Sequence, residues 1–439
     1  MSAPKRSILT MNAFELADGK PDGLLARRLA NVGAASVLFY REPIEMVSAK
    51  GAWMHAADGT SYLDFYNNVP SVGHCHPRVV AAVSEQLGVL NINTRYLNER
   101  TERYLDALKA KLPERLSNVV LTCSGSEAND LALRIAAKVT GDTGVIVTEN
   151  AYHGNTAAVT AISPSALIGA DPPANVATVA PPGRAAYGED IAGGFRDAIE
   201  RAAADLEAAG HGLAALVCDS IFSSDGVFAD PSGFLHGAVE AVRARGGLYV
   251  ADEVQPGFAR TGSGFWGFEH HGVCPDMVTM GKPMGNGYPM AGLAAAPAHL
   301  GAFCADVGYF NTFGGSPVAA AAGQAVLDVI EEEGLQPNAE RVGAYLFERL
   351  LSLAEGSGTV AEVRREGLFM GIELCRDGDL ARPDPELASA TIDGLRRRRV
   401  LIGAAGRFGN VLKVRPPLCL TLEEADFFAD ALGAELAVR

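Results

Sequence analysis

Short apolar runs alternate with helix-like segments from residue 119 onward, and this alternation sets the expected fold. Amphipathic stretches such as Gly194–Ala209 and Leu235–Arg245 lie between several of the runs. Apolar strands that alternate with amphipathic helices are typical of a mostly parallel sheet covered on both faces. We therefore predict an α/β fold with a seven-stranded sheet. The seven predicted strands are Val119–Thr122, Gly144–Thr148, Val176–Ala180, Ala214–Cys218, Leu248–Ala251, Met277–Met280 and Gly292–Ala295.

The regions on either side of this sheet predict a smaller second domain. Residues 44–65 alternate in polarity around an Asp58-Gly59 step, a pattern typical of antiparallel strands joined by a tight turn. Before them, Leu24–Ala30 has apolar residues at helical spacing. After Pro317 the pattern predicts the helices Val318–Glu333, Asn338–Ala354, Pro385–Arg398 and Leu422–Leu432, with strands near Val360–Arg364 and Met370–Leu374.

The length and composition define the broad class of protein. A chain of 439 residues is long enough for two or three domains, and 48% hydrophobic with 20% charged residues is typical of a globular protein. We expect residues 1–72 to join the small domain, 73–320 to form the large domain, and 321–439 to form the C-terminal small domain.

Charge and cysteine content narrow the expected partners and location. The net charge is −15 with no long basic run, so nucleic acid is not an expected partner. The seven cysteines are scattered, odd in number and without a Cys-x-x-Cys pair, which favours reduced thiols in the cytoplasm. No signal-peptide-like start or transmembrane run is found, so no membrane association is expected. His74 and His76 have no completing carboxylate or thiol pattern, and no metal is predicted.

A glycine-rich stretch, residues 280–287, holds the first candidate catalytic residue, Lys282. It follows the predicted strand Met277–Met280, so the lysine stands at a strand end on tightly turned backbone. Asp252 ends another predicted strand, and 282 − 252 = 30 residues is about one strand–helix–strand unit. Pyridoxal phosphate requires such a pair, because the lysine forms a Schiff base and the acid binds the ring nitrogen. A solvated surface lysine is the alternative.

Together with the motifs below, Asp252 and Lys282 make the sequence resemble the class III aminotransferases, which are fold-type-I pyridoxal phosphate enzymes, across nearly its whole length. The resemblance implies the fold-type-I architecture, with the cofactor bound by residues 73–320. It rests on five motifs in the family order, which are Ser124-Gly125-Ser126-Glu127-Ala128-Asn129, Ala151-Tyr152-His153-Gly154, Asp252-Glu253-Val254-Gln255, the Lys282 stretch, and Asn311-Thr312-Phe313-Gly314-Gly315-Ser316-Pro317.

The resemblance also implies roles for the cofactor-binding residues. Gly125 and Ser126 open a helix after a strand, where free backbone amides bind the cofactor phosphate; an ordinary helix cap is the alternative. Tyr152 resembles the aromatic residue that stacks on the cofactor ring, with a core tyrosine as the alternative. Gln255 resembles the residue near the ring hydroxyl, and Asp252 is implied as the partner of the ring nitrogen.

Thr312 resembles a family threonine that reaches the phosphate from the neighbouring subunit. The resemblance therefore implies a homodimer with shared active sites, and it leaves open whether dimers pair into tetramers. A loop threonine beside a glycine turn is the alternative. After substrate frees it, Lys282 is implied as the base that moves the proton. His153 remains open as a cofactor contact or a turn residue.

Substrate contacts depart from the family pattern. Asn68 precedes a Gly-His-x-His-Pro turn whose loop faces the active site in the family, with a loop cap as the alternative. Asp219 stands where most members have glutamate, and Lys413 stands where many have an arginine for the substrate carboxylate. Lysine lacks the bidentate fork of arginine, which suits a phosphate or a looser anion. Arg95 is another candidate anion contact, with a surface salt bridge as the alternative.

Three functions are compared. Family frequency favours an aminotransferase that moves an amino group from an amine or amino acid to a keto acid by a ping-pong mechanism. Several segments look like the phospholyases that eliminate phosphate from O-phosphoethanolamine or phosphohydroxylysine, although Asp219 and Asp225 differ from them, and an ammonia-eliminating lyase would belong to the same branch. Both reactions start with the same proton removal, so the sequence separates them poorly. A cofactor-binding regulator without turnover is disfavoured by the complete Asp252/Lys282 pair and the lack of a DNA-binding extension.

Overall fold

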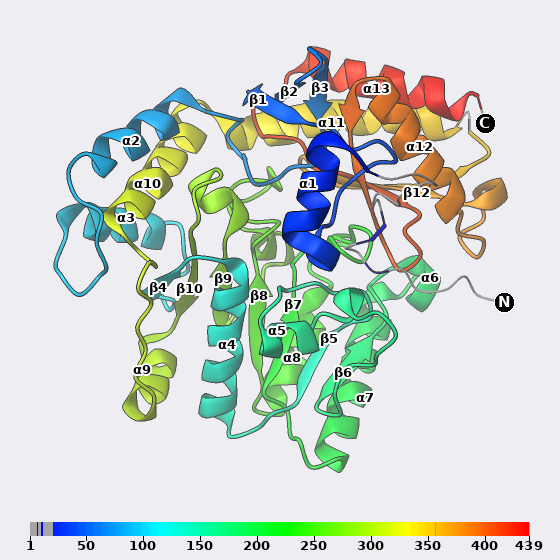
Figure 1. Ribbon diagram of the computed structural model, residues 1–439. Coiled ribbons are helices and arrows are strands. Elements are labelled where there is room, and N and C mark those ends of the chain that lie inside the picture. The colour runs from blue at the N-terminus through cyan, green and yellow to red at the C-terminus, as the bar shows by residue number, and fades with distance from the viewer. Residues whose placement is uncertain (1–6, 8–9, 12–20, 356, 439) are drawn as a thin grey trace.

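A seven-stranded sheet forms the centre of the computed structural model, which describes residues 7, 10–11, 21–355 and 357–438 (Figure 1). The strand order is β4-β10-β9-β8-β7-β5-β6. β10 pairs antiparallel with β4 and β9, whereas the other neighbours pair in parallel. The predicted mostly parallel sheet is confirmed, and each strand overlaps its predicted range. The strands are β4 (Asn118–Thr122), β5 (Val145–Thr148), β6 (Val176–Val179), β7 (Ala215–Cys218), β8 (Leu248–Asp252), β9 (Met277–Met280) and β10 (Ala291–Ala295).

Helices cover both faces of this sheet because side chains alternate along each strand. Leu248 and Val250 of β8 belong to the core cluster under α4 and α9. Tyr249 and Ala251 belong to the cluster under α7 and α8. The first face carries α4 (Gly125–Thr140), α5 (Ala157–Ala161) and α9 (Pro297–Asp306), and the second carries α6 (Arg184–Tyr187), α7 (Ile191–Ala208) and α8 (Leu235–Ala244).

A smaller α/β part lies above the large sheet in Figure 1 and contains two four-stranded sheets. The predicted Asp58-Gly59 turn joins two of the strands, and Gly59 has the positive φ of 86° that such a turn needs. The sheets have the orders β1-β2-β3-β13 and β11-β12-β15-β14. The strands are β1 (Met46–Lys50), β2 (Trp53–Ala56), β3 (Ser61–Asp64), β11 (Val360–Glu366), β12 (Phe369–Leu374), β13 (Val400–Leu401), β14 (Gly403–Ala405) and β15 (Val411–Val414).

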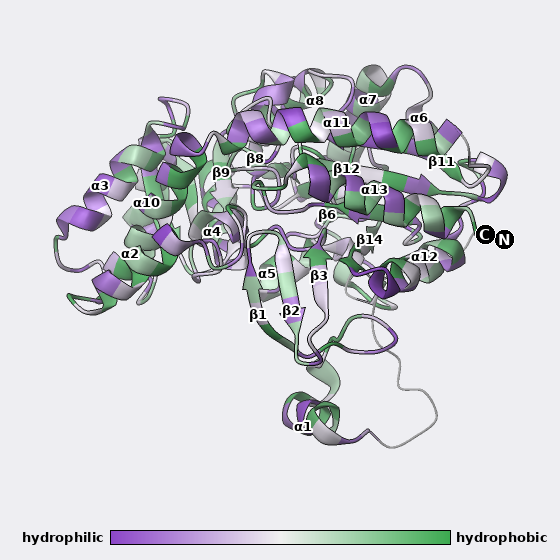
Figure 2. Ribbon diagram, turned by 90° about the horizontal axis from the view of Figure 1, so that it is seen from above, coloured by the Kyte–Doolittle hydropathy of each residue, from purple (hydrophilic) through white to green (hydrophobic). Residues whose placement is uncertain are grey.

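The remaining helices lie beside and above these sheets. α2 and α3 both pack on α10, and α11, α12 and α13 belong to the smaller part (Figure 1). In Figure 2, α1 stands away from the body, and none of its residues is buried. The helices are α1 (Gly23–Val32), α2 (Pro77–Leu87), α3 (Glu99–Lys109), α10 (Pro317–Glu332), α11 (Leu335–Glu355), α12 (Pro385–Arg397) and α13 (Leu422–Leu436).

The structure also contains helices and strands that the sequence pattern did not predict, namely α3, α5, α6, α9 and β13–β15. β13 pairs in parallel with β3, and so joins the N-terminal strands to a segment more than 330 residues later, since 400 − 63 = 337. Across the described residues, every helix is too short or too polar to cross a bilayer. The domain boundaries at residues 72 and 320 stay a prediction.

Candidate active site

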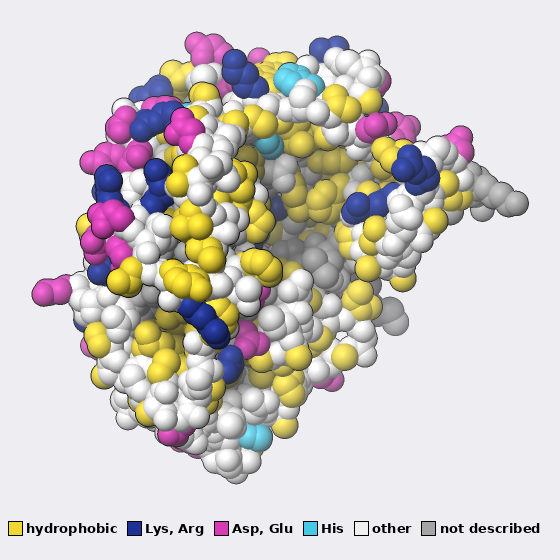
Figure 3. Space-filling view, turned by 60° about the vertical axis from the view of Figure 1, so that its left-hand side comes forward, with side chains coloured by type: hydrophobic (Ala, Val, Ile, Leu, Met, Phe, Trp, Pro, Cys, Tyr) yellow, Lys and Arg dark blue, Asp and Glu magenta, His cyan; other side chains and the backbone are white. Residues whose placement is uncertain are grey.

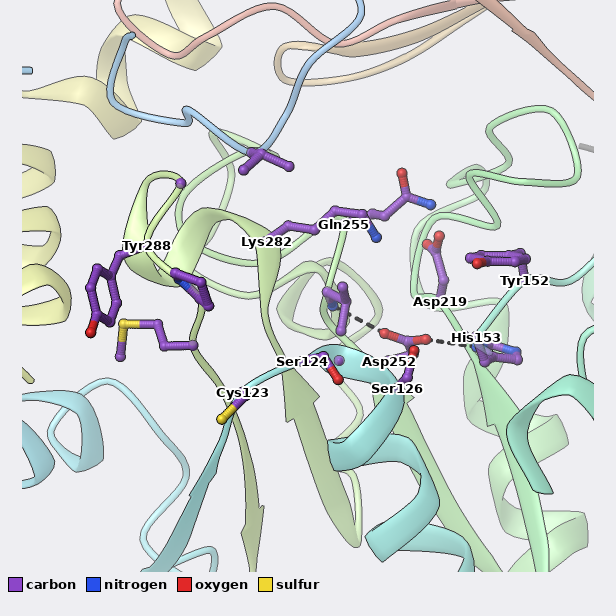
Figure 4. A pocket seen from close by; sticks show the side chains of 17 residues that line it. Cys123, Ser124, Ser126, Tyr152, His153, Asp219, Asp252, Gln255, Lys282 and Tyr288 are labelled. Carbon is purple, nitrogen blue, oxygen red and sulfur yellow. Dashed lines mark hydrogen bonds and ion pairs between the residues drawn. The ribbon is translucent and has the colours of Figure 1, made fainter. Parts of the chain in front are cut away.

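A cavity of about 330 Å³ opens at the carboxyl ends of the parallel strands, where ligands bind in such sheets (Figure 4). Its walls come from the segments that follow β4, β5, β7, β8 and β9. It contains six of the predicted site residues, and Asp219 as well. The lining residues are Val69, Cys123, Ser124, Gly125, Ser126, Tyr152, His153, Gly154, Asp219, Asp252, Val254, Gln255, Lys282, Gly287, Tyr288, Pro289 and Met290.

Asp252 is the last residue of β8, and its carboxylate is held by three N–H groups. Oδ2 accepts from Nδ2 of Asn129 at 3.0 Å and lies 2.7 Å from Nδ1 of His153. Oδ1 accepts from the backbone N–H of Val254 at 3.1 Å. Thr279 of β9 fixes Asn129 in turn, because its hydroxyl donates to Oδ1 of Asn129 at 2.6 Å. The carboxylate is therefore oriented by several strands before any ligand arrives.

His153 is a buried partner of Asp252. Its side chain is 1% exposed, and its backbone N–H donates to the hydroxyl of Ser163 at 2.9 Å. Nε2 of His153 has no hydrogen-bond partner among the residues that the structure describes. The sequence left this histidine as a contact or a turn residue, and the structure places it beside the acid.

Lys282 follows β9 and opens the short helix η4 (Lys282–Gly285). Its φ is +26°, which is strained for a residue with a side chain and is typical of functional turns. Asn286 anchors this turn, because its Oδ1 accepts from Val72 N–H at 3.0 Å and its Nδ2 donates to the Gly73 carbonyl at 2.9 Å. Burial lowers the pKa of Lys282, which favours the neutral amine, although Asp252 opposes this effect.

The first turn of α4 forms an anion cradle. Ser124 caps the helix by accepting from Glu127 N–H at 3.3 Å, which leaves the first backbone amides facing the cavity. A Cβ added to Gly125 would lie 2.9 Å from Cγ2 of Val254, so a larger residue cannot take this position without a shift. Gly154 makes a similar approach to Ser126. The free amides and the glycine at the closest approach fit a phosphate group.

Tyr152 and Gln255 form the side and roof of the cavity. In Figure 4 the Tyr152 ring lies at the opposite end of the cavity from Tyr288, and Gln255 extends beside Lys282. Burial raises the pKa of the Tyr152 phenol, which keeps its ring neutral. The Gln255 side chain is fixed at both ends: Nε2 donates to the Ser223 hydroxyl at 2.6 Å, and Oε1 accepts from Nη1 of Arg415 at 3.0 Å.

Two carboxyl groups occupy the loop after β7. Asp219 accepts from the backbone N–H of Ile221 at 2.9 Å and from the backbone N–H and hydroxyl of Ser223. Burial raises the pKa of Asp219. Asp225 accepts from the Thr148 hydroxyl at 2.6 Å, and burial raises its pKa to about 7. The loop therefore holds two acids, of which Asp219 lines the cavity and the buried Asp225 does not.

Four predicted site residues lie outside the cavity lining. Lys413 is 2% exposed and stands behind Ser223, with its amine 3.4 Å from that hydroxyl. Asn68 is buried, and its Nδ2 has no partner within the described chain. Arg95 is exposed and stacks on Phe310 at 4.2 Å, and Thr312 is also exposed. The roles predicted for these residues stay predictions.

The two histidines of the Gly-His-x-His-Pro turn contact separate carboxylates. His74 lies 2.7 Å from Asp64, and His76 lies 3.1 Å from Glu333. In the described part of the chain, no group of three or more His, Cys, Asp or Glu residues could hold a metal ion.

The sequence did not single out three residues that support this site. Asn129 holds Asp252, and Ser223 and Arg415 hold Gln255. Asn129 is the last residue of the motif that begins at Ser124, so this motif could have pointed to it. The contact between Gln255 and Arg415 spans 160 residues and leaves no local trace in the sequence.

An oriented acid, a lysine of lowered pKa and an anion cradle together fit an enzyme that uses pyridoxal phosphate. A model of the class III aminotransferase family matches residues 39–436, and the chain belongs to this family. The predicted family, the fold type and the dependence on pyridoxal phosphate are confirmed.

The relatives of the chain include both aminotransferases and phospholyases. An "Alanine--glyoxylate aminotransferase 2-like" protein of Drosophila melanogaster is 40% identical over 415 residues, which is 91% of this chain and 84% of that protein. "Ethanolamine-phosphate phospho-lyase homolog 1" of Caenorhabditis elegans is 36% identical over 417 residues, or 90% and 89%. A solved structure of an Arthrobacter phospholyase in complex with phosphoethanolamine is 43% identical, with a TM-score of 0.92, covering 95% of this chain and 100% of that chain.

Proposed function

We propose that the chain moves an amino group from an amine or amino acid to a keto acid in two half-reactions. One observation carries this proposal: Asp252 and Lys282 stand at the ends of neighbouring strands and face one cavity. When bound, pyridoxal phosphate supplies an electron-withdrawing ring that acidifies the C–H bond beside the substrate nitrogen. The family of the chain favours transfer of the amino group as the outcome.

Each residue has a separate task in this proposal. Asp252 would hold the protonated ring nitrogen, and the amides of Gly125 and Ser126 would hold the phosphate. Tyr152 would support the ring, and Gln255 would contact the ring hydroxyl. Nζ of Lys282 would be the attachment point of the cofactor and the base that carries the proton, because its lowered pKa makes the neutral amine accessible.

Elimination of phosphate from a phosphorylated amine is the second candidate. It is supported by the TM-score of 0.92 and the 43% identity to the phospholyase that was solved with phosphoethanolamine. Both reactions use the same proton removal by Lys282, so they differ only in whether a leaving group sits on the carbon next to the deprotonated one.

One experiment separates the two reactions. Amines are added to the purified holoenzyme without keto acid, and the absorbance of its cofactor is followed with β-alanine, 4-aminobutyrate, diaminobutyrate, alanine and O-phosphoethanolamine. If the enzyme transfers the amino group, the absorbance band of the resting cofactor disappears and returns only when a keto acid is added. Elimination lets the band recover while phosphate or ammonia accumulates over many turnovers. No response to any amine contradicts both candidates.

We also propose that the chain works as a homodimer with shared active sites. Its support is an exposed apolar surface around the loop before α3 and the Thr312 loop, where Leu97 is 97% exposed and Phe313 74%. Figure 3 shows hydrophobic side chains gathered on this side of the molecule, beside a hollow. Monomers rarely expose such patches without a partner.

Mixed dimers test the sharing of active sites. Lys282→Ala and Thr312→Glu should each be inactive, because one removes the base and the other places a negative charge beside the phosphate. In mixed dimers one of the two sites has neither change, so mixing should restore about a quarter of the activity. No recovery in dimers that are shown to exchange subunits would contradict shared sites.

A cytoplasmic location is proposed as well. The seven cysteines are all free, which suits a reducing compartment. Fractionation of the source cells tests this proposal, and recovery in an organelle or an extracellular fraction would contradict it.

A further inference from the structure

Four cations lie in or near the cavity wall. Lys282 lines the cavity, and Arg260, Lys413 and Arg415 lie close to one another behind it. They are near enough to affect one another, since the charge of Arg415 lowers the pKa of each of the other three. Within the described residues, none of the four forms an ion pair with a carboxylate, although the chain as a whole carries a net charge of −15. Asp252, Asp219, Asp225 and Asp64 act on three of these cations from a distance, whereas no carboxylate forms an ion pair with Arg415 within the described residues.

Two of these cations already have other partners. Arg260 is 1% exposed and donates to the backbone carbonyls of Leu368 and Pro416. The Lys413 amine is buried between the Ser223 hydroxyl, at 3.4 Å, and the Phe369 ring, at 5.4 Å. Lys413 does not line the cavity, and its amine is already in contact with a hydroxyl group and an aromatic ring.

Arg415 is different because one edge of its guanidinium is unused. Nη1 donates to Oε1 of Gln255 at 3.0 Å, and the group lies over the Tyr66 ring at 4.4 Å. Its backbone is fixed as well, since Arg415 N–H donates to the Phe65 carbonyl at 3.1 Å. Nε has no partner in the described part of the chain, and no hydrogen bond of Nη2 is found there either. Nε and Nη2 form the parallel pair of donors that matches two oxygens of one anion.

Gln255 connects this edge to the reaction centre. It lines the cavity together with Lys282, and Arg415 is bonded to it directly. Tyr66 and Gln255 hold the guanidinium plane from two directions, so little rotamer freedom remains to be lost on binding. The unpaired Nε and Nη2 atoms therefore belong to a guanidinium that is held in place and directly contacts a residue of the cavity wall.

We propose that Arg415, rather than Lys413, binds the anionic group of the substrate through its Nε and Nη2 atoms. This inference rests on the proposed function, because it assumes that an amine reacts near Lys282. The ligand is an oxyanion on the far end of an amine or keto acid. Its chemistry is shared by a carboxylate, as in an amino or keto acid, and by a phosphate monoester, as in a phosphorylated amine. Arg415 is then a specificity-determining residue.

Binding of anions that cannot react tests this assignment directly. Propionate and ethyl phosphate carry the two kinds of oxyanion without an amine, and their affinity for the holoenzyme is measured by calorimetry. Arg415→Gln should weaken the tighter-binding probe by at least about tenfold, and Arg415→Lys should recover part of the loss. Arg196→Gln, an exposed arginine on α7, is the matched control and should change nothing. The tighter probe identifies the carboxylate or the phosphate as the preferred group.

Kinetics give the second readout. Two pairs of amines are compared by their KM values, and each pair has an anionic and a neutral member. The anionic members carry an oxyanion besides the amine and are γ-aminobutyrate and O-phosphoethanolamine. The neutral members lack that oxyanion and are butylamine and ethanolamine. Arg415→Gln should raise the KM for the anionic member of a pair at least about tenfold and leave the neutral member within about twofold. Lys413→Gln should change both members alike.

Three results would overturn the assignment. They are a wild-type holoenzyme that binds neither probe, an equal loss for anionic and neutral amines in Arg415→Gln, and an anion-specific loss in Lys413→Gln alone. Failure of the proposed function looks different. In that case the cofactor absorbance of the wild-type protein does not respond to any amine, whether or not the probes bind.

Discussion

Nδ1 of His153 lies 2.7 Å from Oδ2 of Asp252, and both side chains are almost fully buried. This pair joins the end of β5 to the end of β8, so the acid is fixed by a neighbouring segment of the sheet as well as by its own strand. Nε2 of His153 is buried and has no partner among the described residues, so the ring makes its hydrogen bond to Asp252 through Nδ1 alone. We interpret it as a positioning residue.

His153→Leu should weaken both the fold and the reaction. Removal of one donor from a buried carboxylate costs about 1–3 kcal/mol in the free energy of unfolding. We expect kcat/KM to fall about tenfold, the equivalent of one hydrogen bond of about 1.4 kcal/mol. His153→Asn keeps an N–H near the position of Nδ1 and should retain more of both. Denaturant unfolding and steady-state kinetics are the measurements, and equal losses in the two variants would contradict the interpretation.

Gly125→Ala should weaken cofactor binding by crowding the anion cradle. The new Cβ would lie 2.9 Å from Cγ2 and 3.1 Å from Cγ1 of Val254, so one of the two segments has to move. A shift of the first turn of α4 misaligns its amides, and we expect the Kd of the cofactor to rise about tenfold. Titration of the apoenzyme with cofactor, followed by its absorbance, measures this change.

The chain offers a control and a rescue for this substitution. Gly301 is exposed on a helix and has nothing within 4 Å of an added Cβ, so Gly301→Ala should leave cofactor affinity unchanged. Val254→Ala removes both crowding atoms, and the double variant with Gly125→Ala should regain most of the affinity. A double variant as weak as Gly125→Ala alone would mean that the crowding is not the cause.

The large sheet could be predicted because its signal is local. Leu248 to Ala251 is a continuous apolar run, and such runs mark strands that are buried on both faces. Asp252 and Lys282 were predictable for the same reason, since each directly follows such a run. α3 was missed because only three of its eleven residues are buried, Thr101, Tyr104 and Leu108, and six of the others are charged. Its apolar stripe is too narrow to stand out from the surrounding loop.

Contacts between distant segments could not be predicted in this way. β13 has two residues and exists because it pairs with β3, so its own sequence carries little preference. The position of Arg415 depends on Gln255 and Tyr66, which belong to other segments. Resemblance therefore pointed to Lys413, with Arg95 as another candidate, whereas the unpaired donors belong to Arg415.

Asp225→Asn should make stability less dependent on pH. Burial raises the pKa of Asp225 from 3.8 to about 7, so the folded protein binds a proton that the unfolded chain releases between these values. Stability from this group is complete below pH 3.8 and is lost as the pH rises toward 7. The loss reaches up to about 4 kcal/mol, from about three pKa units at 1.36 kcal/mol each. An amide avoids it while keeping an acceptor for Thr148 or Asn150.

Urea unfolding at pH 5 and pH 8 checks this prediction. The free energy of unfolding of the wild type should fall between the two values by more than that of Asp225→Asn, and the variant should be the more stable protein at pH 8. Asp58→Asn, at an exposed loop carboxylate, serves as a control and should show the wild-type pH dependence over this range, because the pKa of Asp58 is lowered rather than raised. A variant that is less stable than the wild type at both pH values would contradict the account.

Arg415→Gln should move the acid limb of the pH–rate profile to higher pH. The amine of Lys282 accepts a proton only when neutral, and its pKa is lowered first by burial and then by the charge of Arg415. Without that charge the ammonium form of Lys282 is less destabilised, so its pKa rises and the neutral fraction at a given pH falls. We expect a shift of about half to one pH unit. The measurement is kcat at saturating butylamine as a function of pH, because this substrate has no oxyanion and does not need an anion contact. Arg196→Gln is the control and should leave the profile unchanged. An acid limb that stays in place, or moves to lower pH, would show that Arg415 does not act on Lys282.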